Sequence, residues 1–127
     1  MVYIVGLMSL LAAEAGAKQV FAIECSTMAH HTKQIVHDNN YDDIITVIRA
    51  DFESLRVLPC KTVDIILCDW RGRSPLKDAH FKHILHARDL FLIKDGSGRI
   101  FPECLNLNIC GVEKEPSEVR KVRCSDE

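Results

Sequence analysis

The sequence has little net charge, few aromatic side chains and no C-x-x-C pair. Its 16 basic and 18 acidic residues leave a formal net charge of −2, which argues against the basic surface of a simple nucleic-acid-binding domain. Because 47% of the 127 residues are apolar, intrinsic disorder is also excluded for most of the chain. The length fits one domain of roughly 100–200 residues, and we expect no direct contact with nucleic acid.

The spacing of the six cysteines excludes the usual zinc patterns, which need closely paired ligands. A disulfide framework is typical of short, loop-rich secreted chains, whereas this chain contains several long apolar runs. We therefore expect free, mostly buried thiols and a cytoplasmic or nuclear location.

A membrane segment is not indicated either. The uncharged stretch Met1–Ala13 is shorter than the roughly 20 apolar residues that a spanning helix needs. No basic residue precedes it and Glu14 follows it, which is unlike a secretory signal. We expect no membrane partner.

Apolar runs alternate with helical patterns along the chain. Periodicity predicts strands over residues 1–5, 20–23, 44–48, 63–68 and 99–101, and helices over 7–15, 28–39 and 78–92. Gly16 is expected to end the first helix and Ser26 to cap the second. This alternation is typical of an α/β fold with a parallel sheet, in which ligands bind at the carboxyl ends of the strands.

Two residues suit a nucleotide at that edge. Gly6 stands between a strand and a helix, where a backbone comes close to a ligand, and Glu24 ends the next apolar run. An acid at this distance commonly accepts hydrogen bonds from ribose hydroxyls. On spacing alone, a helix-start glycine and a solvated glutamate explain the pattern equally well.

Several segments together resemble the protein arginine N-methyltransferase family, with a leaning to its type I group. Gly6–Ser26 is similar to the family's nucleotide-binding segment, and Val63–Gly72 to the segment that enters its double-glutamate loop. Ala87–Asp89 and Ile100–Pro102 resemble two later segments. The resemblance extends over about residues 1–112 and implies a Rossmann-like fold that binds S-adenosylmethionine.

The resemblance also implies a domain plan. Residues 1–102 would form a partial Rossmann-like methyltransferase domain, 103–112 the first strand of a β-barrel that is otherwise missing, and 113–127 a charged, disordered tail. Val2 and Ile4 replace the first two glycines of the family's G-x-G-x-G loop. Because the family's central strand ends before this loop, we expect a sheet incomplete at the N-terminus. Either Met1–Val5 serves as its central strand, or the sheet lacks its middle.

Positions that match the family's motifs imply a cofactor site. Gly6 would approach the cofactor, and Glu24 would bind its ribose. Phe52 and Glu53 would lie beside the adenine, with Glu53 accepting from the amino group. His80 matches a position near the cofactor. His80, His83 and His86 recur on one predicted helix, but this spacing drifts around the helix and lacks further ligands, so we predict no metal site.

The catalytic pair implied by the resemblance is Asp69 and Asp78, which would hold the substrate guanidinium where the family has glutamates. Carboxylates match the planar fork of guanidinium donors. Asp is one methylene shorter than Glu, and a misplacement of about 1 Å can cost on the order of a hundredfold in rate. The loop between the two carboxylates also carries three cations, Arg71, Arg73 and Lys77.

We therefore predict a protein arginine N-methyltransferase homologue whose own activity is weak or lost. Its substrate would be an arginine-containing protein, such as a histone or an RNA-binding protein. Two alternatives remain. The chain could be a non-catalytic regulatory paralogue that binds an active methyltransferase partner chain, or a truncated fragment that does not fold alone.

Overall fold

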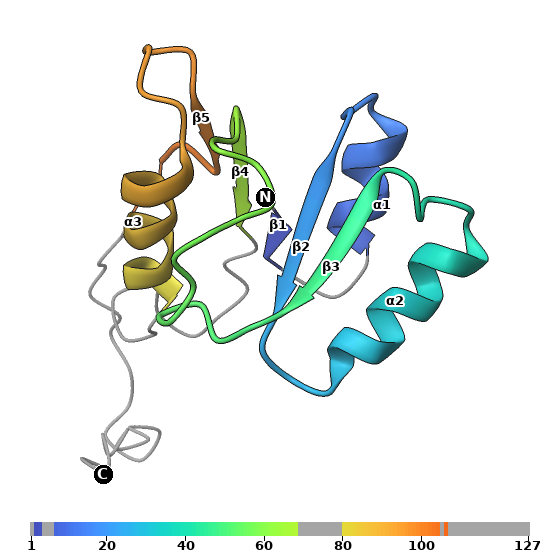
Figure 1. Ribbon diagram of the computed structural model, residues 1–127. Coiled ribbons are helices and arrows are strands. Elements are labelled where there is room, and N and C mark those ends of the chain that lie inside the picture. Colours follow the sequence, from blue (N-terminus) through green and yellow to red (C-terminus); the bar gives the residue numbers. More distant parts are fainter. Residues whose placement is uncertain (1, 4–6, 69–79, 105, 107–127) are drawn as a thin grey trace, which may run out of the picture.

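The alternation of strands and helices is present in the computed structural model, which describes residues 2–3, 7–68, 80–104 and 106 (Figure 1). The elements are, in chain order, β1 (Val2–Tyr3), α1 (Leu7–Glu14), β2 (Val20–Glu24), α2 (Met28–Asp38), β3 (Ile45–Arg49), β4 (Ile65–Cys68), α3 (His80–Phe91) and β5 (Arg99–Phe101). This order confirms the predicted α/β class.

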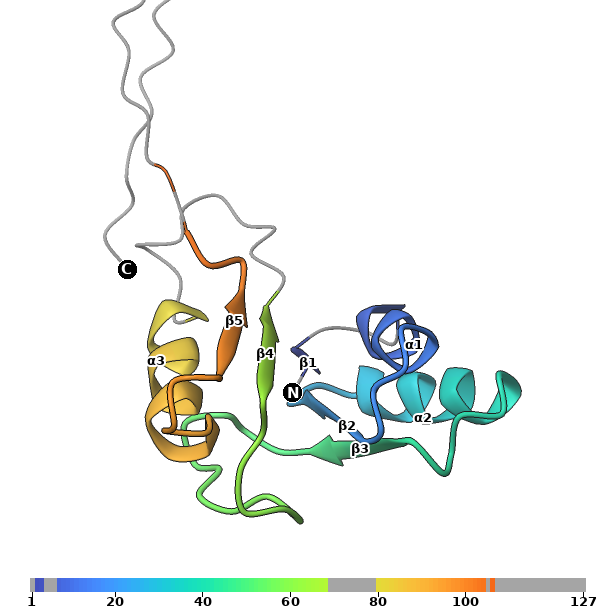
Figure 2. The ribbon, with the colours of Figure 1, turned by 90° about the horizontal axis from the view of Figure 1, so that it is seen from above.

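The strands form one parallel sheet in the order β3-β2-β1-β4-β5. The chain winds outward from β1 through β2 to β3, and then returns to add β4 and β5 on the other side of β1. Helices α1 and α2 lie on one face of the sheet and α3 lies on the other (Figure 2). This doubly wound, Rossmann-like arrangement reverses direction beside β1, where such sheets bind ligands.

Strand β2 shows why the sheet is covered on both faces. Val20 and Ala22 pack with residues of α1 and α2, whereas Phe21 and Ile23 pack with residues of α3. All four are at most 3% exposed. Successive side chains of a strand point to opposite faces, so an unbroken apolar run needs a helix layer on each side.

Strand β1 occupies the centre of the sheet. Val2 is in register with Ala22 of β2 and with Leu67 of β4, and Tyr3 is in register with Cys68. Val2–Tyr3 thus lies at the centre of the sheet, which agrees, for these two residues of Met1–Val5, with the first of the two alternatives considered above. Gly6 lies outside the described residues, as do the predicted tail at 113–127 and most of the predicted barrel strand at 103–112.

The C-terminus of α1 and the N-terminus of α2 can be compared with the predicted caps. Gly16 follows α1 with a φ of +93°, and its N–H donates to the Ala13 carbonyl while Ala17 N–H donates to the Ala12 carbonyl. This is the Schellman pattern that favours glycine, as predicted. The N-cap of α2 is Thr27 rather than Ser26, but the Ser26 hydroxyl accepts the N–H of Met28 at 3.1 Å.

The cysteines depart from the prediction in their burial. Cys25, Cys60, Cys68 and Cys104 carry thiols that form no disulfide, as expected, but Cys25 and Cys104 are exposed and the other two are only partly buried. The expectation of mostly buried thiols is wrong for these four, and for Cys25 the reason is that it follows the carboxyl end of β2. Among the described helices, none has the length and apolar character that a membrane span requires.

Candidate functional site

The carboxyl ends of β2 and β3 bring two predicted cofactor-binding segments to the same edge of the sheet. Glu24, the last residue of β2, is in register with Arg49 of β3. The N–H of Ala50, which follows β3, donates to the Glu24 carbonyl at 3.3 Å. The turn that carries Phe52 and Glu53 starts at the next residue. Parallel pairing therefore places residues that are about 28 positions apart at one edge.

The carboxylate of Glu24 is half-buried and held by the chain that follows it. Its Oε1 accepts the backbone N–H of Ser26 at 2.8 Å, and the Ser26 hydroxyl in turn accepts the N–H of Met28. An ionised carboxylate has about four acceptor sites, so this bond orients Glu24 and leaves acceptor capacity for a ligand.

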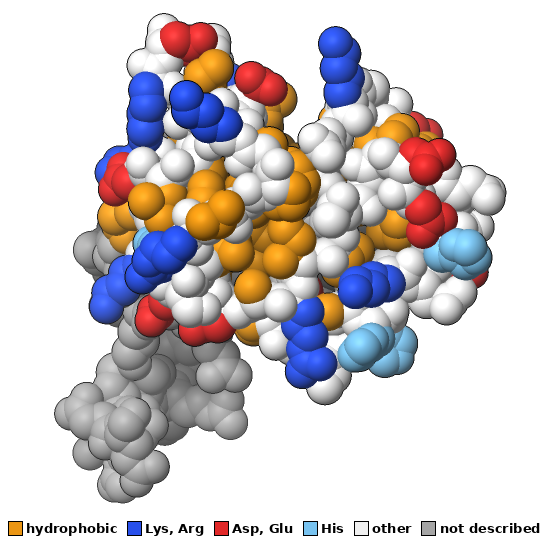
Figure 3. Space-filling model, in the orientation of Figure 1, with side chains coloured by type: hydrophobic (Ala, Val, Ile, Leu, Met, Phe, Trp, Pro, Cys, Tyr) orange, Lys and Arg blue, Asp and Glu red, His pale blue; other side chains and the backbone are white. Residues whose placement is uncertain are grey.

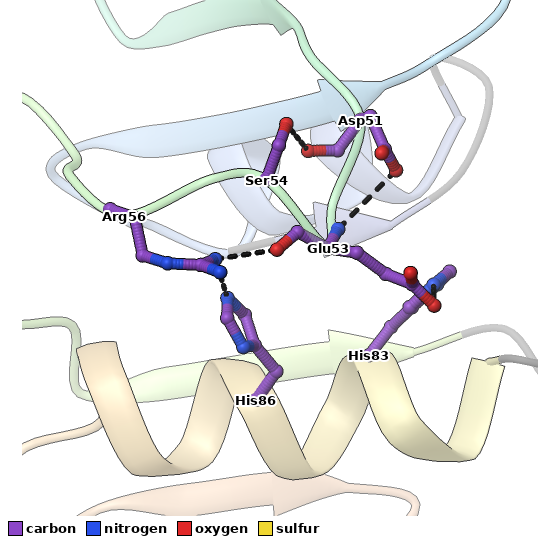
Figure 4. Close-up of polar contacts among 6 residues, drawn as sticks. All are labelled: Asp51, Glu53, Ser54, Arg56, His83 and His86. Atoms are coloured by element: carbon purple, nitrogen blue, oxygen red, sulfur yellow. Dashed lines mark hydrogen bonds and ion pairs between the residues drawn. The ribbon is translucent and has the colours of Figure 1, made fainter.

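A tight turn after β3 sends Phe52 and Glu53 in opposite directions. One Asp51 carboxylate oxygen accepts the N–H of Glu53 at 3.3 Å, and the Ser54 hydroxyl donates to the Asp51 carbonyl at 2.9 Å (Figure 4). Phe52 is 3% exposed and belongs to the core that packs against α3, whereas the Glu53 side chain is 64% exposed. The turn thus presents a carboxylate beside a buried aromatic ring.

Helix α3 supplies a residue to this edge that sequence reasoning did not assign to it. The rings of His83 and Phe52 are stacked, with centroids 5.4 Å apart and planes at 29°. Nε2 of His83 lies 3.6 Å from Oε1 of Glu53, which makes a loose ion pair when the imidazole is protonated (Figure 4). The signal was present in the histidine spacing on one helix, but spacing alone does not show which loop the helix packs against.

His86 lies one helical turn after His83 on α3. It contacts Leu55 and Arg56, the two residues that follow the turn at Phe52 and Glu53. Its Nε2 lies 2.9 Å from the Leu55 carbonyl and 3.1 Å from Nη1 of Arg56. A carbonyl only accepts and a guanidinium only donates, so the tautomer decides which bond forms. The ring of His86 also meets the edge of Phe52, with centroids 6.1 Å apart. The two histidines therefore hold Phe52 from two sides.

The segment Ala87–Asp89, which resembles a family segment, divides between core and surface. Ala87 is fully buried, whereas Arg88 and Asp89 are exposed and joined by a hydrogen bond of 2.7 Å. This bond lowers the pKa of Asp89 and raises the pKa of Arg88. Arg88 and Asp89 therefore pair with each other, and neither is a residue of the turn at Phe52.

These contacts test none of the binding or catalytic roles predicted for the site residues. Asp69 and Asp78, the predicted catalytic pair, and Gly6 lie outside the described residues. His80 is the first residue of α3. Within the described part of the chain, no group of three or more His, Cys, Asp or Glu residues could hold a metal ion.

Comparisons with known proteins identify relatives of this chain. No family model matches the chain. It is 40% identical over 108 residues to "Protein arginine N-methyltransferase 1" of Chlamydomonas reinhardtii, an alignment that covers 85% of this chain and 30% of that protein. It is 37% identical over 123 residues to the protein of the same name from Caenorhabditis elegans, covering 95% and 35%. The chain thus spans about a third of the length of these relatives.

Solved structures give the same result. Arabidopsis thaliana protein arginine methyltransferase 10 superposes with a TM-score of 0.71 at 33% identity, over 80% of this chain and 28% of that one. The Trypanosoma brucei PRMT1 enzyme–prozyme heterotetrameric complex with AdoHcy gives 0.69 at 34% identity, over 80% and 32%. The chain is therefore related in sequence and in fold to the protein arginine N-methyltransferases, which confirms the resemblance that its motifs predicted.

Proposed function

We propose that this chain binds S-adenosylmethionine at the carboxyl ends of β2 and β3, as a homologue of the protein arginine N-methyltransferases with weak or lost activity of its own. The observation that carries the proposal is the convergence of two carboxylates, Glu24 and Glu53, on one edge of the sheet, with the Phe52–His83 stack beside Glu53. A nucleoside offers ribose hydroxyls and an amino group, which carboxylates accept, and a flat ring, which an aromatic wall suits.

The chemical types of the residues at this edge suit the groups that adenosine offers. Glu24 is oriented by Ser26 and keeps acceptor capacity for two hydroxyls. Glu53 is mostly exposed and pairs only loosely with His83, at 3.6 Å. Exposed ion pairs contribute about 0–1 kcal/mol to stability. Replacing the Glu53–His83 contact by a hydrogen bond from a ligand amino group therefore costs little.

The reaction implied by the resemblance needs a methyl donor and carboxylates that hold the substrate guanidinium. When bound, S-adenosylmethionine would supply an electrophilic methyl group: its S–CH3 bond would break to leave S-adenosylhomocysteine, and the guanidinium nitrogen that accepts the methyl group would release a proton to solvent. Asp69 and Asp78 would grip the substrate guanidinium and fix one nitrogen in place, so that their contribution is positioning and charge. Weak activity is expected because each carboxylate is one methylene shorter than glutamate and because Arg71 and Arg73 stand between them in sequence.

Transfer of a labelled methyl group to an arginine-rich peptide tests the enzyme proposal. We expect a low rate that Asp69→Asn and Asp78→Asn abolish. Arg71→Gln combined with Arg73→Gln should raise it, because two charges that repel the substrate are removed. The matched control is Lys33→Gln, an exposed cation of α2. A rate that none of these changes alters contradicts the assigned roles.

A regulatory role is the second candidate, and one comparison favours it. The Trypanosoma brucei structure is a complex of an enzyme and a prozyme. By analogy, this chain would bind an active methyltransferase chain in the cytoplasm or nucleus. Adding the chain to an active methyltransferase should then change the methylation rate of a histone or an RNA-binding protein. A chain without a cooperative thermal transition would instead be a fragment that does not fold alone.

A further inference from the structure

The Glu53 carboxylate faces a titratable partner, the imidazole of His83. Oε1 of Glu53 lies 3.6 Å from Nε2 of His83, which is longer than a hydrogen bond. Figure 4 shows the two side chains reaching toward each other, one from the turn after β3 and the other from α3. A neutral imidazole at this distance does not engage the carboxylate, whereas a protonated imidazole makes the contact an ion pair. The contact therefore changes with the charge of His83.

The two side chains differ in how firmly they are held. The His83 ring is stacked on Phe52 of the buried core, and its side chain is only 15% exposed. The Glu53 side chain is 64% exposed, and acidic side chains lie at the surface over the turn that follows β3 (Figure 3). An attraction between the two therefore moves the carboxylate toward the ring, rather than the ring toward the carboxylate.

Other charged groups packed around this contact have partners of their own. On α3, Nε2 of His86 lies 3.1 Å from the Arg56 guanidinium, a cation rather than a carboxylate. On the turn, the Asp51 carboxylate accepts the backbone N–H of Glu53. Strand β4, which packs with α3, contributes one titratable group, the partly buried thiol of Cys68. Among the described groups at this edge, the carboxylate–imidazole contact is thus the one that turns from neutral to ionic as an imidazole gains a proton.

We propose that protonation of His83 draws Glu53 away from the ligand and so weakens the binding of S-adenosylmethionine as the pH falls below neutral. This inference rests on the proposed function, in which Glu53 accepts a hydrogen bond from the adenine amino group. The amino group and a charged imidazole compete for the same carboxylate. Because histidine changes its charge between about pH 5 and 8, the competition falls in the physiological range. Protons and the cofactor therefore weaken each other's binding.

The expected effect is modest because the carboxylate is largely exposed. Exposed ion pairs contribute little, and a contribution of that size corresponds to about a two- to fivefold change in a dissociation constant. The Glu24 carboxylate is held by the backbone N–H of Ser26, which does not titrate. Its share of the binding should therefore be the same at both ends of this pH range, so that acid weakens cofactor binding without abolishing it.

Calorimetric titration of the full 127-residue chain with S-adenosylhomocysteine at pH 7.5 and pH 5.5 tests the proposal. The readout is the ratio of the two dissociation constants. We expect binding by the native chain to be about two- to fivefold weaker at pH 5.5, and a ratio of one for His83→Gln, which takes up no proton. An analogue with hydrogen in place of the adenine amino group should bind more weakly at pH 7.5 and lose nothing further in acid. Because the analogue carries the same amino-acid group, it also controls for titration of the ligand.

Variants of other histidines locate the effect. His80→Gln and His86→Gln on α3, and His30→Gln on α2, should keep the native ratio even where the absolute affinity changes. Thermal transitions at both pH values show whether each chain is folded. A native ratio of one, a ratio that His83→Gln preserves or that another of these variants removes, or an equal acid loss with the analogue overturns the inference alone. Absence of binding by the folded native chain at both pH values overturns the proposed function, and this inference with it.

Discussion

The imidazole of His83 lies stacked against the ring of Phe52, with centroids 5.4 Å apart. This contact joins α3 to the turn after β3 and leaves the His83 side chain only 15% exposed. Because Glu53 sits on the same turn, the stack links the packing of the core to the placement of a carboxylate at the candidate cofactor site.

Replacing His83 with alanine should affect both stability and ligand binding. Aromatic pairs contribute about 0.5–1.5 kcal/mol beyond their buried area, so His83→Ala should lower the melting temperature by several degrees. The turn that carries Glu53 would lose the stacking contact that holds it against α3, so S-adenosylhomocysteine should bind several-fold more weakly. The control is His30→Ala, an exposed histidine of α2, which should change neither value. Equal effects of the two variants would contradict this role.

Phe52 should be far more sensitive to truncation than an exposed aromatic residue. Phe52 is 3% exposed, so Phe52→Ala should cost about 3–5 kcal/mol of unfolding free energy through the cavity that it leaves. Phe81 of α3 is 41% exposed, and Phe81→Ala should cost much less. Chemical denaturation of both variants measures the difference. Similar losses would show that Phe52 does not anchor the turn.

Gly16, which follows α1, and Gly98, which precedes β5, should respond to alanine for different reasons. A Cβ at Gly98 would lie 2.7 Å from Cγ of Leu92 and 2.9 Å from the Ile93 carbonyl, so overpacking should cost about 1–3 kcal/mol. At Gly16 a Cβ would meet nothing within 4 Å, and only the positive φ opposes it, at about 1–2 kcal/mol. Relief of the Gly98→Ala loss by Leu92→Ala, and no such relief for Gly16→Ala, would separate the two causes.

Acid should weaken the turn before β5. The Ser97 hydroxyl and N–H donate to one oxygen of Asp95, at 2.6 and 2.8 Å, and these bonds lower the pKa of Asp95 below its ordinary value of 3.8. Stability from this carboxylate is therefore full above its ordinary pKa and is lost as pH falls through the lower, folded value. In melts from pH 6 to pH 2, Asp95→Asn should reduce this acid dependence, and less so in a Ser97→Ala background.

Much of the fold was predictable because its signals are local. The apolar run at Val20–Ile23 predicts a strand buried on both faces, and the glycine at position 16 predicts a helix end; both are found. The edge position of Glu24 followed from the rule that ligands gather at the carboxyl ends of parallel strands. These inferences needed no knowledge of how distant segments pack.

The features that the sequence did not predict depend on tertiary contacts. The spacing of His83 and His86 showed a recurring pattern, but only the packing of α3 against the turn at Phe52 shows what these rings touch. Cys25 was expected among the mostly buried thiols, yet it lies just past the end of β2 and is exposed.

The most direct test of the account is a calorimetric titration of the chain with S-adenosylhomocysteine, comparing the native sequence with Glu24→Gln. Hydrogen bonds to a charged group contribute about 1.5–3 kcal/mol, so the substitution should weaken binding by roughly 10- to 100-fold. The glutamine keeps an oxygen for the Ser26 N–H, and its melting temperature should stay close to that of the native chain. Saturable one-to-one binding that Glu24→Gln weakens supports the account. Identical isotherms, or no binding by the folded native chain, would contradict it.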